Sequence, residues 1–134
     1  MRRINKIILH CSATKEGFSF TAKDIDDWHK QRGWKKIGYH YVVLLDGTVQ
    51  SGRPESEIGS HTVGQNADSI GVCYIGGLDL NGKPKDTRTI QQKKALDSLI
   101  SDLLKTYPAS TVHGHHEFAN KACPCFDVKK EFGL

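Results

Sequence analysis

Two short apolar runs constrain the fold of this chain more than any other feature. The run INKIILHCSA, residues 4–13, is rich in β-branched side chains, with an apolar part at residues 7–9 that ends at His10. IGVCYIGG, residues 70–77, is likewise rich in apolar residues. Runs of this length without polar alternation are typical of strands buried within a sheet. The sequence therefore predicts a central sheet with both faces covered.

Two longer segments carry helix signals. Residues 21–33 open on a Thr with an Asp three residues later and close on a Gly, and residues 89–107 open on a Thr–Gln capping box, continue with apolar residues at helical spacing and stop before a Pro. These patterns predict two helices. Residues 127–132, DVKKEF, predict a short third helix near the end of the chain.

The remaining segments indicate how the sheet is completed. Asp46-Gly47 separates two β-rich runs and predicts a hairpin, STVHG at residues 110–114 is the last strand candidate, and residues 52–69 are dense in Gly, Ser and Asn, which favours a long ordered loop. Strands and helices thus alternate around one hairpin. We predict a single α/β domain over residues 1–134, with a mixed central sheet flanked by helices.

Composition is ordinary for a soluble protein and excludes some classes. The 134 residues are 37% hydrophobic and 25% charged, with a net charge of +4 whose Lys and Arg are scattered among acidic residues. No apolar run approaches the roughly 18 residues of a membrane span, and the apolar part of the N-terminal run is too short for a signal peptide. We expect a monomer made in the cytoplasm, with no membrane insertion and no nucleic acid partner.

The cysteines do not form an evident disulfide framework. They stand at positions 11, 73, 123 and 125, an irregular spacing that favours reduced thiols. Cys73 lies between Val72 and Tyr74 and is expected to be a buried, inert thiol. Cys123 and Cys125 are separated by one Pro, and by spacing either of them is a candidate metal ligand.

The segment HGHHEFANKACPC, residues 113–125, has the residue types of a metal site. Imidazole and thiolate suit zinc, but this spacing matches no closed structural zinc motif. His10 ends an apolar strand, where its side chain needs a polar or metal partner. His113 and His115 would share a side if the last strand continued, with His116 on the other, so spacing alone does not choose among them.

The other histidines have less specific settings. His29 and His40 are expected to pack and to form hydrogen bonds, and Trp28 and Trp34 are expected in the core. His61 lies in the Gly-rich loop, where its ring is expected either to contact a bound substrate or to hold the loop.

Four stretches together resemble one family. ILHCSAT, WHKQRGWKKIGYHYVVLLDGTVQSGR, IGSHTVGQNADSIGVCYIGG and HHEFANKACPCFD are similar in residues and order to the zinc-dependent N-acetylmuramoyl-L-alanine amidases of the phage T-seven lysozyme type, which are related in fold to animal peptidoglycan recognition proteins. The resemblance covers nearly the whole chain. It is more specific than any single motif because it joins four separate segments.

The resemblance implies a set of site residues. It makes His10, His115 and Cys123 the ligands of one Zn²⁺ per chain, with Tyr39 and Lys121 as the catalytic pair. Two imidazoles and one thiolate leave the fourth tetrahedral position open to water, as in catalytic zinc sites.

The same resemblance implies the reaction. The amide between N-acetylmuramic acid and L-alanine in peptidoglycan would be hydrolysed, with Lys121 stabilising the oxyanion and Tyr39 orienting the water or passing its proton. From its place in the Gly-rich loop, His61 is assigned to substrate binding, and Glu117 is interpreted as a supporting residue rather than the base. The chain departs from the family pattern at Cys125, because the related phage protein has Ser after the Cys-Pro pair.

These observations predict a phage or prophage endolysin that acts on the cell wall after release or export. Three alternatives remain open at this point. They are a non-catalytic peptidoglycan-binding protein, a polymerase-binding regulator, and a structural zinc domain whose fourth ligand would be Cys125.

Overall fold

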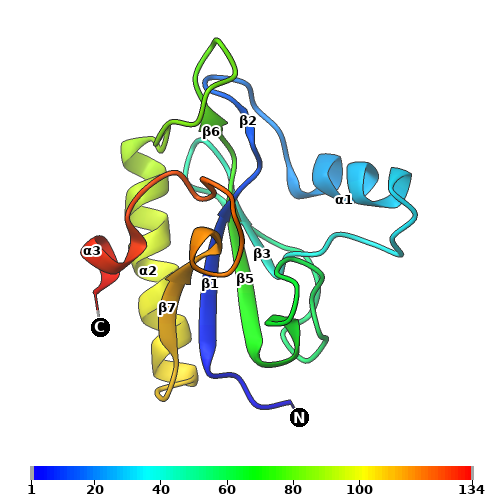
Figure 1. Ribbon diagram of the computed structural model, residues 1–134, viewed down its shortest axis with the longest axis vertical. Coiled ribbons are helices and arrows are strands. Elements are labelled where there is room, and N and C mark those ends of the chain that lie inside the picture. The colour runs from blue at the N-terminus through cyan, green and yellow to red at the C-terminus, as the bar shows by residue number, and fades with distance from the viewer. Residues whose placement is uncertain (1, 134) are drawn as a thin grey trace.

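A five-stranded sheet of order β4-β3-β5-β1-β7 organises the chain in the computed structural model, which describes residues 2–133 (Figure 1). The strands are β1 (Lys6–Cys11), β3 (Tyr41–Val43), β4 (Val49–Ser51), β5 (Ser69–Tyr74) and β7 (Thr111–Gly114). β1 is parallel to its neighbours β5 and β7, β3 is parallel to β5, and β4 is the antiparallel edge. The predicted mixed sheet with its hairpin is confirmed.

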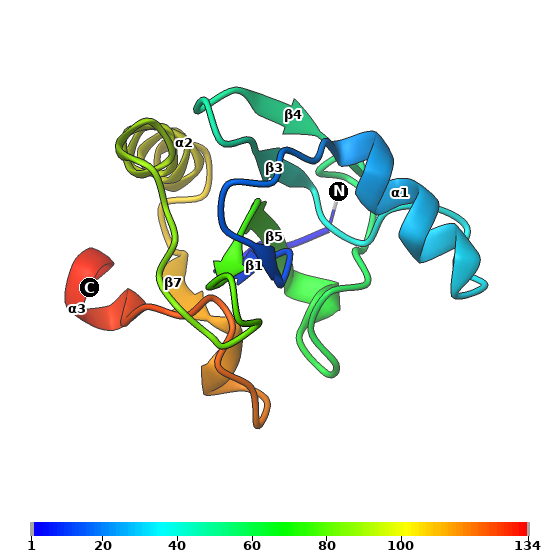
Figure 2. The ribbon, with the colours of Figure 1, turned by 90° about the horizontal axis from the view of Figure 1, so that it is seen from above.

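Helices cover both faces of this sheet. α1 (Ala22–Gln31) and α2 (Ile90–Thr106) lie on opposite sides of it, and the short α3 (Val128–Phe132) lies beside β7 (Figure 2). Both predicted capping boxes are present: the side chain of Thr21 accepts from the backbone N–H of Asp24, and Thr89 pairs with Gln92 in the same way. The three helices predicted from the sequence are confirmed.

Alternation along the strands separates two apolar clusters. Because successive side chains of a strand point to opposite faces, odd-numbered residues of β1 and even-numbered residues of β5 face α2. The α2 face buries Ile7, Leu9, Val43, Ile70, Val72, Tyr74, Leu96, Ile100, Leu103 and Val112. The α1 face buries Ile25, Ile37, Val42, Cys73 and Ile75. Cys73 is fully buried, as predicted.

Some elements lie outside the sequence prediction. β2 (Thr14–Lys15) and β6 (Gly77–Leu78) form a separate two-stranded sheet, too short to leave a pattern in the sequence. Single turns of 3₁₀ helix occupy Asn66–Asp68 and His115–Glu117. In residues 2–133, no helix has the length and apolar character needed to cross a bilayer.

Candidate metal centre

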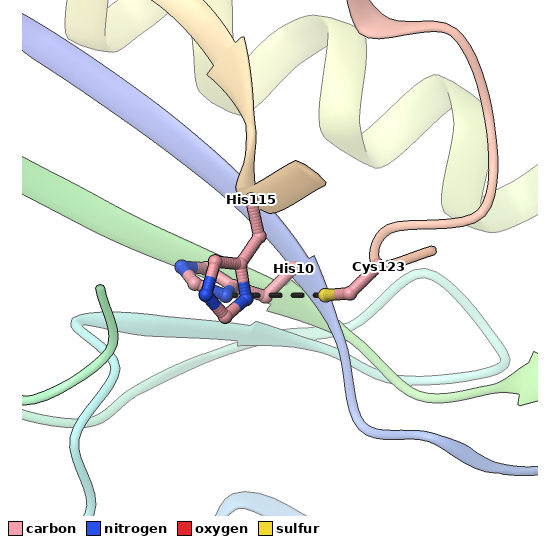
Figure 3. Close-up of side chains that lie close together, drawn as sticks. All are labelled: His10, His115 and Cys123. Carbon is pink, nitrogen blue, oxygen red and sulfur yellow. Dashed lines mark hydrogen bonds between the residues drawn. The ribbon is translucent and has the colours of Figure 1, made fainter. Parts of the chain in front are cut away.

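Three side chains from separate segments converge at one end of the sheet. One nitrogen each from His10 and His115 and the sulfur of Cys123 lie within 4.8 Å of one another (Figure 3). The sulfur of Cys123 is 4.0 Å from Nδ1 of His10, and the rings of His10 and His115 have centroids 4.6 Å apart. His10 is buried, while the other two are partly exposed. These three side chains could hold a metal ion.

Strand register explains why the two histidines meet. β1 and β7 are parallel neighbours with Leu9 opposite Gly114, so the next residues, His10 and His115, lie side by side. This is the carboxyl end of adjacent parallel strands, where open α/β sheets place their ligands.

The end of β7 determines which of His113, His115 and His116 joins the candidate metal site. The strand stops at Gly114 and a 3₁₀ turn starts at His115, so strand alternation does not continue into this segment. His113 instead bonds Glu117, with 2.9 Å between Nδ1 and Oε1, and the second carboxylate oxygen accepts from the backbone N–H of Gly114 at 2.8 Å. His115 therefore faces His10, and Glu117 has the supporting place expected for it.

The backbone holds the sulfur of Cys123 in place. The N–H of Cys11 donates to this sulfur over 3.1 Å, and the N–H of His116 donates to the carbonyl oxygen of Cys123 over 2.8 Å. These two backbone bonds fix the position of the sulfur beside the two histidines. The sulfur of Cys125 points elsewhere, toward Cys11, so the structure brings only one of the two neighbouring thiols to the histidines.

The second nitrogen of His10 is also partnered. Its Nε2 lies 2.9 Å from Nδ1 of His61 and 3.3 Å from Oγ1 of Thr62, and Nε2 of His61 lies 3.3 Å from Oγ of Ser69. The ring of His61 packs against Gly71, where a Cβ would come within 2.6 Å of Cδ2. This chain of contacts orients His10 so that Nδ1 faces the cluster, the role that outer partners have around metal-ligating histidines.

The electrostatic environment keeps these imidazoles neutral. Burial, followed by the charges of His61 and His115, holds the pKa of His10 well below its usual value. Burial lowers the pKa of His61 to about 3, and burial together with the charge of Lys121 lowers the pKa of His115. Neutral imidazole is the form that coordinates metal, so the site is ready to bind near neutral pH.

A cleft opens beside the three donors. Tyr39, His115, Lys121 and Cys123 line it together, along with Cys11, Ser12, Ala13, Ile25, Trp28, His29 and Arg32. An adjoining hollow shares Arg32, His115 and Lys121 and extends over Trp34, Ser60, His61, Thr62, Val63 and Asn66.

Tyr39 lines this cleft beside His10. Its ring centroid is 5.1 Å from that of His10. Burial, followed by the charges of nearby thiols, raises the pKa of its phenol well above 10, so the hydroxyl keeps its proton at neutral pH.

The other sequence predictions in this region have mixed outcomes. His29 and His40 are buried and accept hydrogen bonds from the N–H groups of Gly38 and Gly71, at 2.9 and 3.0 Å, as expected. Trp28 packs against the α1 core but also lines the cleft, and Trp34 lines the adjoining hollow. The sequence interpretation missed both of these positions.

Two groups that contact the metal donors were not predicted from the sequence: the hydroxyl of Thr62, near His10, and the backbone N–H of Cys11, which donates to Cys123. Thr62 could have been noticed because it directly follows His61. The N–H of Cys11 left no signal, because a backbone group carries no sequence information.

The comparisons with known proteins agree with this geometry. The family model described as N-acetylmuramoyl-L-alanine amidase matches residues 1–126. The chain belongs to the N-acetylmuramoyl-L-alanine amidase family. The amidase fold and enzyme class predicted from the sequence are thereby confirmed.

Individual relatives give the same result. The amidase is 46% identical over 124 residues to the endolysin of Escherichia phage T7, a match covering 92% of this chain and 82% of that one. It is 42% identical over 126 residues to the endolysin of Enterobacteria phage K11, covering 94% and 83% of the two chains.

Solved structures show the shared fold. The amidase LysC from Clostridium intestinale superposes with a TM-score of 0.82 at 32% identity, covering 97% of this chain and 82% of that one. Drosophila PGRP-LB superposes with a TM-score of 0.78 at 26% identity, covering 92% and 76%. The predicted relation to peptidoglycan recognition proteins is therefore confirmed at the level of fold.

Proposed function

We propose that residues 1–134 act as one catalytic domain that uses a single zinc ion, held by His10, His115 and Cys123, to hydrolyse the amide between N-acetylmuramic acid and L-alanine. The observation that carries this proposal is the convergence of two imidazoles and one thiolate within 4.8 Å beside an open cleft. When bound, zinc supplies Lewis acidity, which lowers the pKa of water and polarises a carbonyl group.

The donor set fits zinc better than other common metals. Hard ions such as Mg²⁺ and Ca²⁺ prefer oxygen ligands, whereas a thiolate with two neutral imidazoles matches the borderline character of Zn²⁺. The partner of His10 on its far side, His61, and the backbone donor to Cys123 support the same assignment, since zinc ligands are usually oriented in this way.

Tyr39 and Lys121 act on the substrate in this proposal. Attack on the amide carbonyl puts negative charge on its oxygen, and the ammonium of Lys121, on the rim of the cleft, stabilises that charge. The protonated phenol of Tyr39 donates a hydrogen bond to the attacking water or to the developing oxyanion. Neither side chain is a metal donor.

The ring of His61 faces other side chains of the protein. Its Nδ1 faces His10 and Thr62, its Nε2 faces Ser69, and only 9% of the residue is exposed. We therefore propose that His61 acts mainly by orienting His10. Direct contact of His61 with substrate, expected from the sequence, stays a prediction.

The alternatives from the sequence are less well supported. A structural zinc domain needs a fourth protein ligand, but among residues 2–133 the donor cluster has three members, and Cys125 faces Cys11 instead. A non-catalytic receptor would have no use for Tyr39 and Lys121 in the same cleft. No feature of the described chain favours polymerase binding.

The relatives indicate where the enzyme acts. Two relatives that match more than nine tenths of the chain are phage endolysins, and one structural neighbour is a mutant of Drosophila PGRP-LB in complex with tracheal cytotoxin. We propose peptidoglycan as the substrate and the cell wall as the place of action, with a monomer as the active form.

Metal analysis of the purified protein, combined with a peptidoglycan turbidity assay, tests the proposal. We expect one zinc per chain, loss of hydrolysis after chelation, and recovery when zinc is added back. Full activity in metal-free protein would contradict the proposal.

A further inference from the structure

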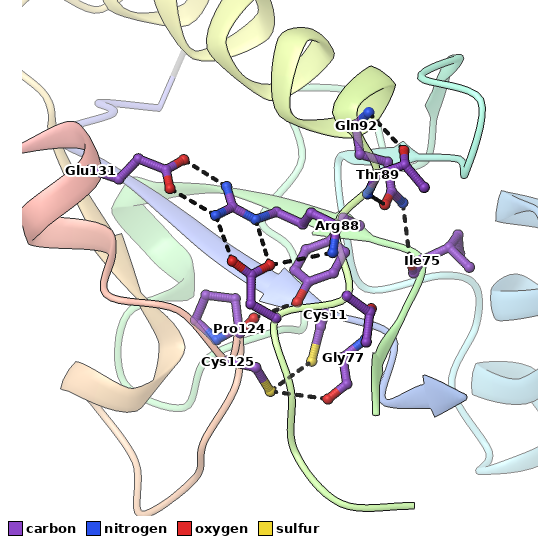
Figure 4. Close-up of polar contacts among 12 residues, drawn as sticks. Cys11, Ile75, Gly77, Arg88, Thr89, Gln92, Pro124, Cys125 and Glu131 are labelled. Carbon is purple, nitrogen blue, oxygen red and sulfur yellow. Dashed lines mark hydrogen bonds and ion pairs between the residues drawn. The ribbon is translucent and has the colours of Figure 1, made fainter. Parts of the chain in front are cut away.

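A pair of thiols lies behind the metal donors, on the opposite face of the sheet end. The sulfurs of Cys11 and Cys125 are 3.9 Å apart, and the sulfur of Cys125 also lies 3.3 Å from the carbonyl oxygen of Gly77 (Figure 4). Cys11 is 5% exposed, whereas Cys125 is partly exposed. Neither sulfur belongs to the metal cluster.

The surrounding structure keeps the two sulfurs in contact. The sulfur of Cys11 packs against the backbone of Gly77 in β6, where an added Cβ would lie 2.4 Å from it. On the other side, the N–H of Cys125 donates to the carbonyl oxygen of Ala122 over 2.7 Å, and the hydroxyl of Tyr74 donates to the carbonyl oxygen of Pro124 over 2.6 Å.

The segment that follows Cys125 is anchored as well. The guanidinium of Arg88 lies 3.4 Å from the ring centroid of Phe126. It also pairs with Glu131 on α3 at 2.6 Å (Figure 4). Cys125 itself has a φ of 71°, a left-handed conformation that side chains other than Gly, Asn and Asp seldom adopt. The fold thus holds a thiol at a backbone position that cysteine does not favour.

We propose that Cys11 and Cys125 form a disulfide in an oxidising environment, which fastens the end of β1 to the segment carrying Cys123. A disulfide needs about 2.05 Å between sulfurs, so the gap of 3.9 Å must close by roughly 1.9 Å when the bond forms. The proposal does not require the metal, because neither thiol is one of its donors.

The chemistry balances with a low-molecular-weight disulfide as the oxidant. Cys125, the more exposed of the two, loses its proton and attacks one sulfur of oxidised glutathione, which forms a mixed disulfide and releases one glutathione thiolate. Cys11 then attacks the sulfur of Cys125 and releases the second. Two cysteine thiols are oxidised and one glutathione disulfide is reduced to two thiols, which take up the two protons that the cysteines lose.

The bond would join two segments that both carry metal donors. Cys11 directly follows His10, and Cys125 is two residues beyond Cys123. The loop that it closes spans most of the chain, and crosslinks over long loops constrain the unfolded state strongly. Oxidation is therefore expected to raise the melting temperature while the zinc content is unchanged.

The test uses the full chain, zinc-loaded and chelator-treated, equilibrated with oxidised glutathione and then mapped by mass spectrometry without reduction. We expect a crosslinked peptide pair containing Cys11 and Cys125, and a fall from four free thiols to two. Dithiothreitol should reverse the change and lower Tm by several degrees. Cys125→Ser should show neither the crosslink nor the Tm shift, whereas Cys73→Ala should show both.

Two outcomes would overturn the proposal. One is a full set of free thiols after equilibration, with no Tm shift. The other is a crosslink that uses Cys123 in the zinc-loaded protein, because the metal donor would then be the reactive thiol. Since mapping and Tm are read without substrate, failure here leaves the amidase assignment untouched.

Discussion

The two faces of the central sheet are built from alternate residues of the same strands, yet they bury different chemistry. Toward α2, β1 and β5 present Ile7, Leu9, Val72 and Tyr74 to an apolar cluster. Toward the other face, β1 presents His10, and the missing side chain of Gly71 makes room for a second imidazole. Both faces bury hydrocarbon, but the α1 face combines its apolar cluster with polar side chains held out of water.

This comparison shows how a small domain can hold buried histidines. Unpartnered imidazoles would be costly inside a protein, but His10, His29, His40 and His61 each have a hydrogen-bond partner. Among the metal donors, Cys123 packs against the apolar cluster on the α2 face. Changes within that cluster should mainly affect stability, whereas changes around the buried histidines should mainly affect function.

Loss of a metal donor is expected to have the largest effect. Cys123→Ser should lose zinc and reduce hydrolysis by more than the roughly 10–100-fold typical of outer partners, because the thiolate is a direct ligand. The neighbouring Cys125→Ser is the matched control and should keep both. Zinc retained by Cys123→Ser and lost by Cys125→Ser would show that the two thiols have been assigned the wrong way round.

A core truncation on the α2 face should affect only stability. Leu96 is 1% exposed, so Leu96→Ala should lower the free energy of unfolding by about 2–5 kcal/mol through lost burial and a new cavity. Urea denaturation measures this change, and Ile90→Ala, at a residue 71% exposed on the same helix, serves as control. If Leu96→Ala altered zinc content in the folded protein, the two faces would not be independent.

Changes to the proposed catalytic pair, Lys121 and Tyr39, should reduce hydrolysis and leave stability unchanged. Lys121→Ala and Tyr39→Phe are expected to fold and keep zinc while hydrolysis falls by about 10²–10³-fold, the loss typical of removing one oxyanion donor. Metal content, circular dichroism and turnover should be measured together, with the exposed Lys94→Ala as control. Near-normal turnover in both variants would remove these residues from the mechanism.

The outer partner of His10 should give the smallest effect. His61→Ala is expected to weaken zinc affinity by about 10–100-fold, because Nε2 of His10 loses its acceptor. His61→Gln offers a side-chain oxygen and should recover part of the affinity. Competition with a chromogenic chelator measures this directly; equal affinities for wild type and His61→Ala would point to the substrate role instead.

Local signals made most of the fold predictable from the sequence. The capping boxes at Thr21 and Thr89, the hairpin turn at Asp46-Gly47 and the apolar strands each depend on neighbouring residues alone. The pairing of β2 with β6 could not be predicted, because two residues per strand carry no periodic pattern.

Residue spacing predicted a metal site of histidine and cysteine ligands, but it did not identify which histidine and which cysteine of residues 113–125 take part. The choice of His115 depends on where β7 ends, and the choice of Cys123 over Cys125 depends on the path of a loop. Both are set by tertiary contacts, such as the backbone bond from His116 to Cys123, rather than by local propensity. Resemblance to the amidase family supplied what spacing left open.

The bond that is cleaved tests the central claim most directly. Purified peptidoglycan should be digested with and without a chelator, and new amino groups and new reducing sugars should be measured side by side. We expect chelator-sensitive release of amino groups, from peptides beginning with L-alanine, and no new reducing ends, because no carboxylate pair of the glycosidase type is among the described residues that line the cleft. Reducing ends that appear even with the chelator would contradict the assignment of a zinc amidase.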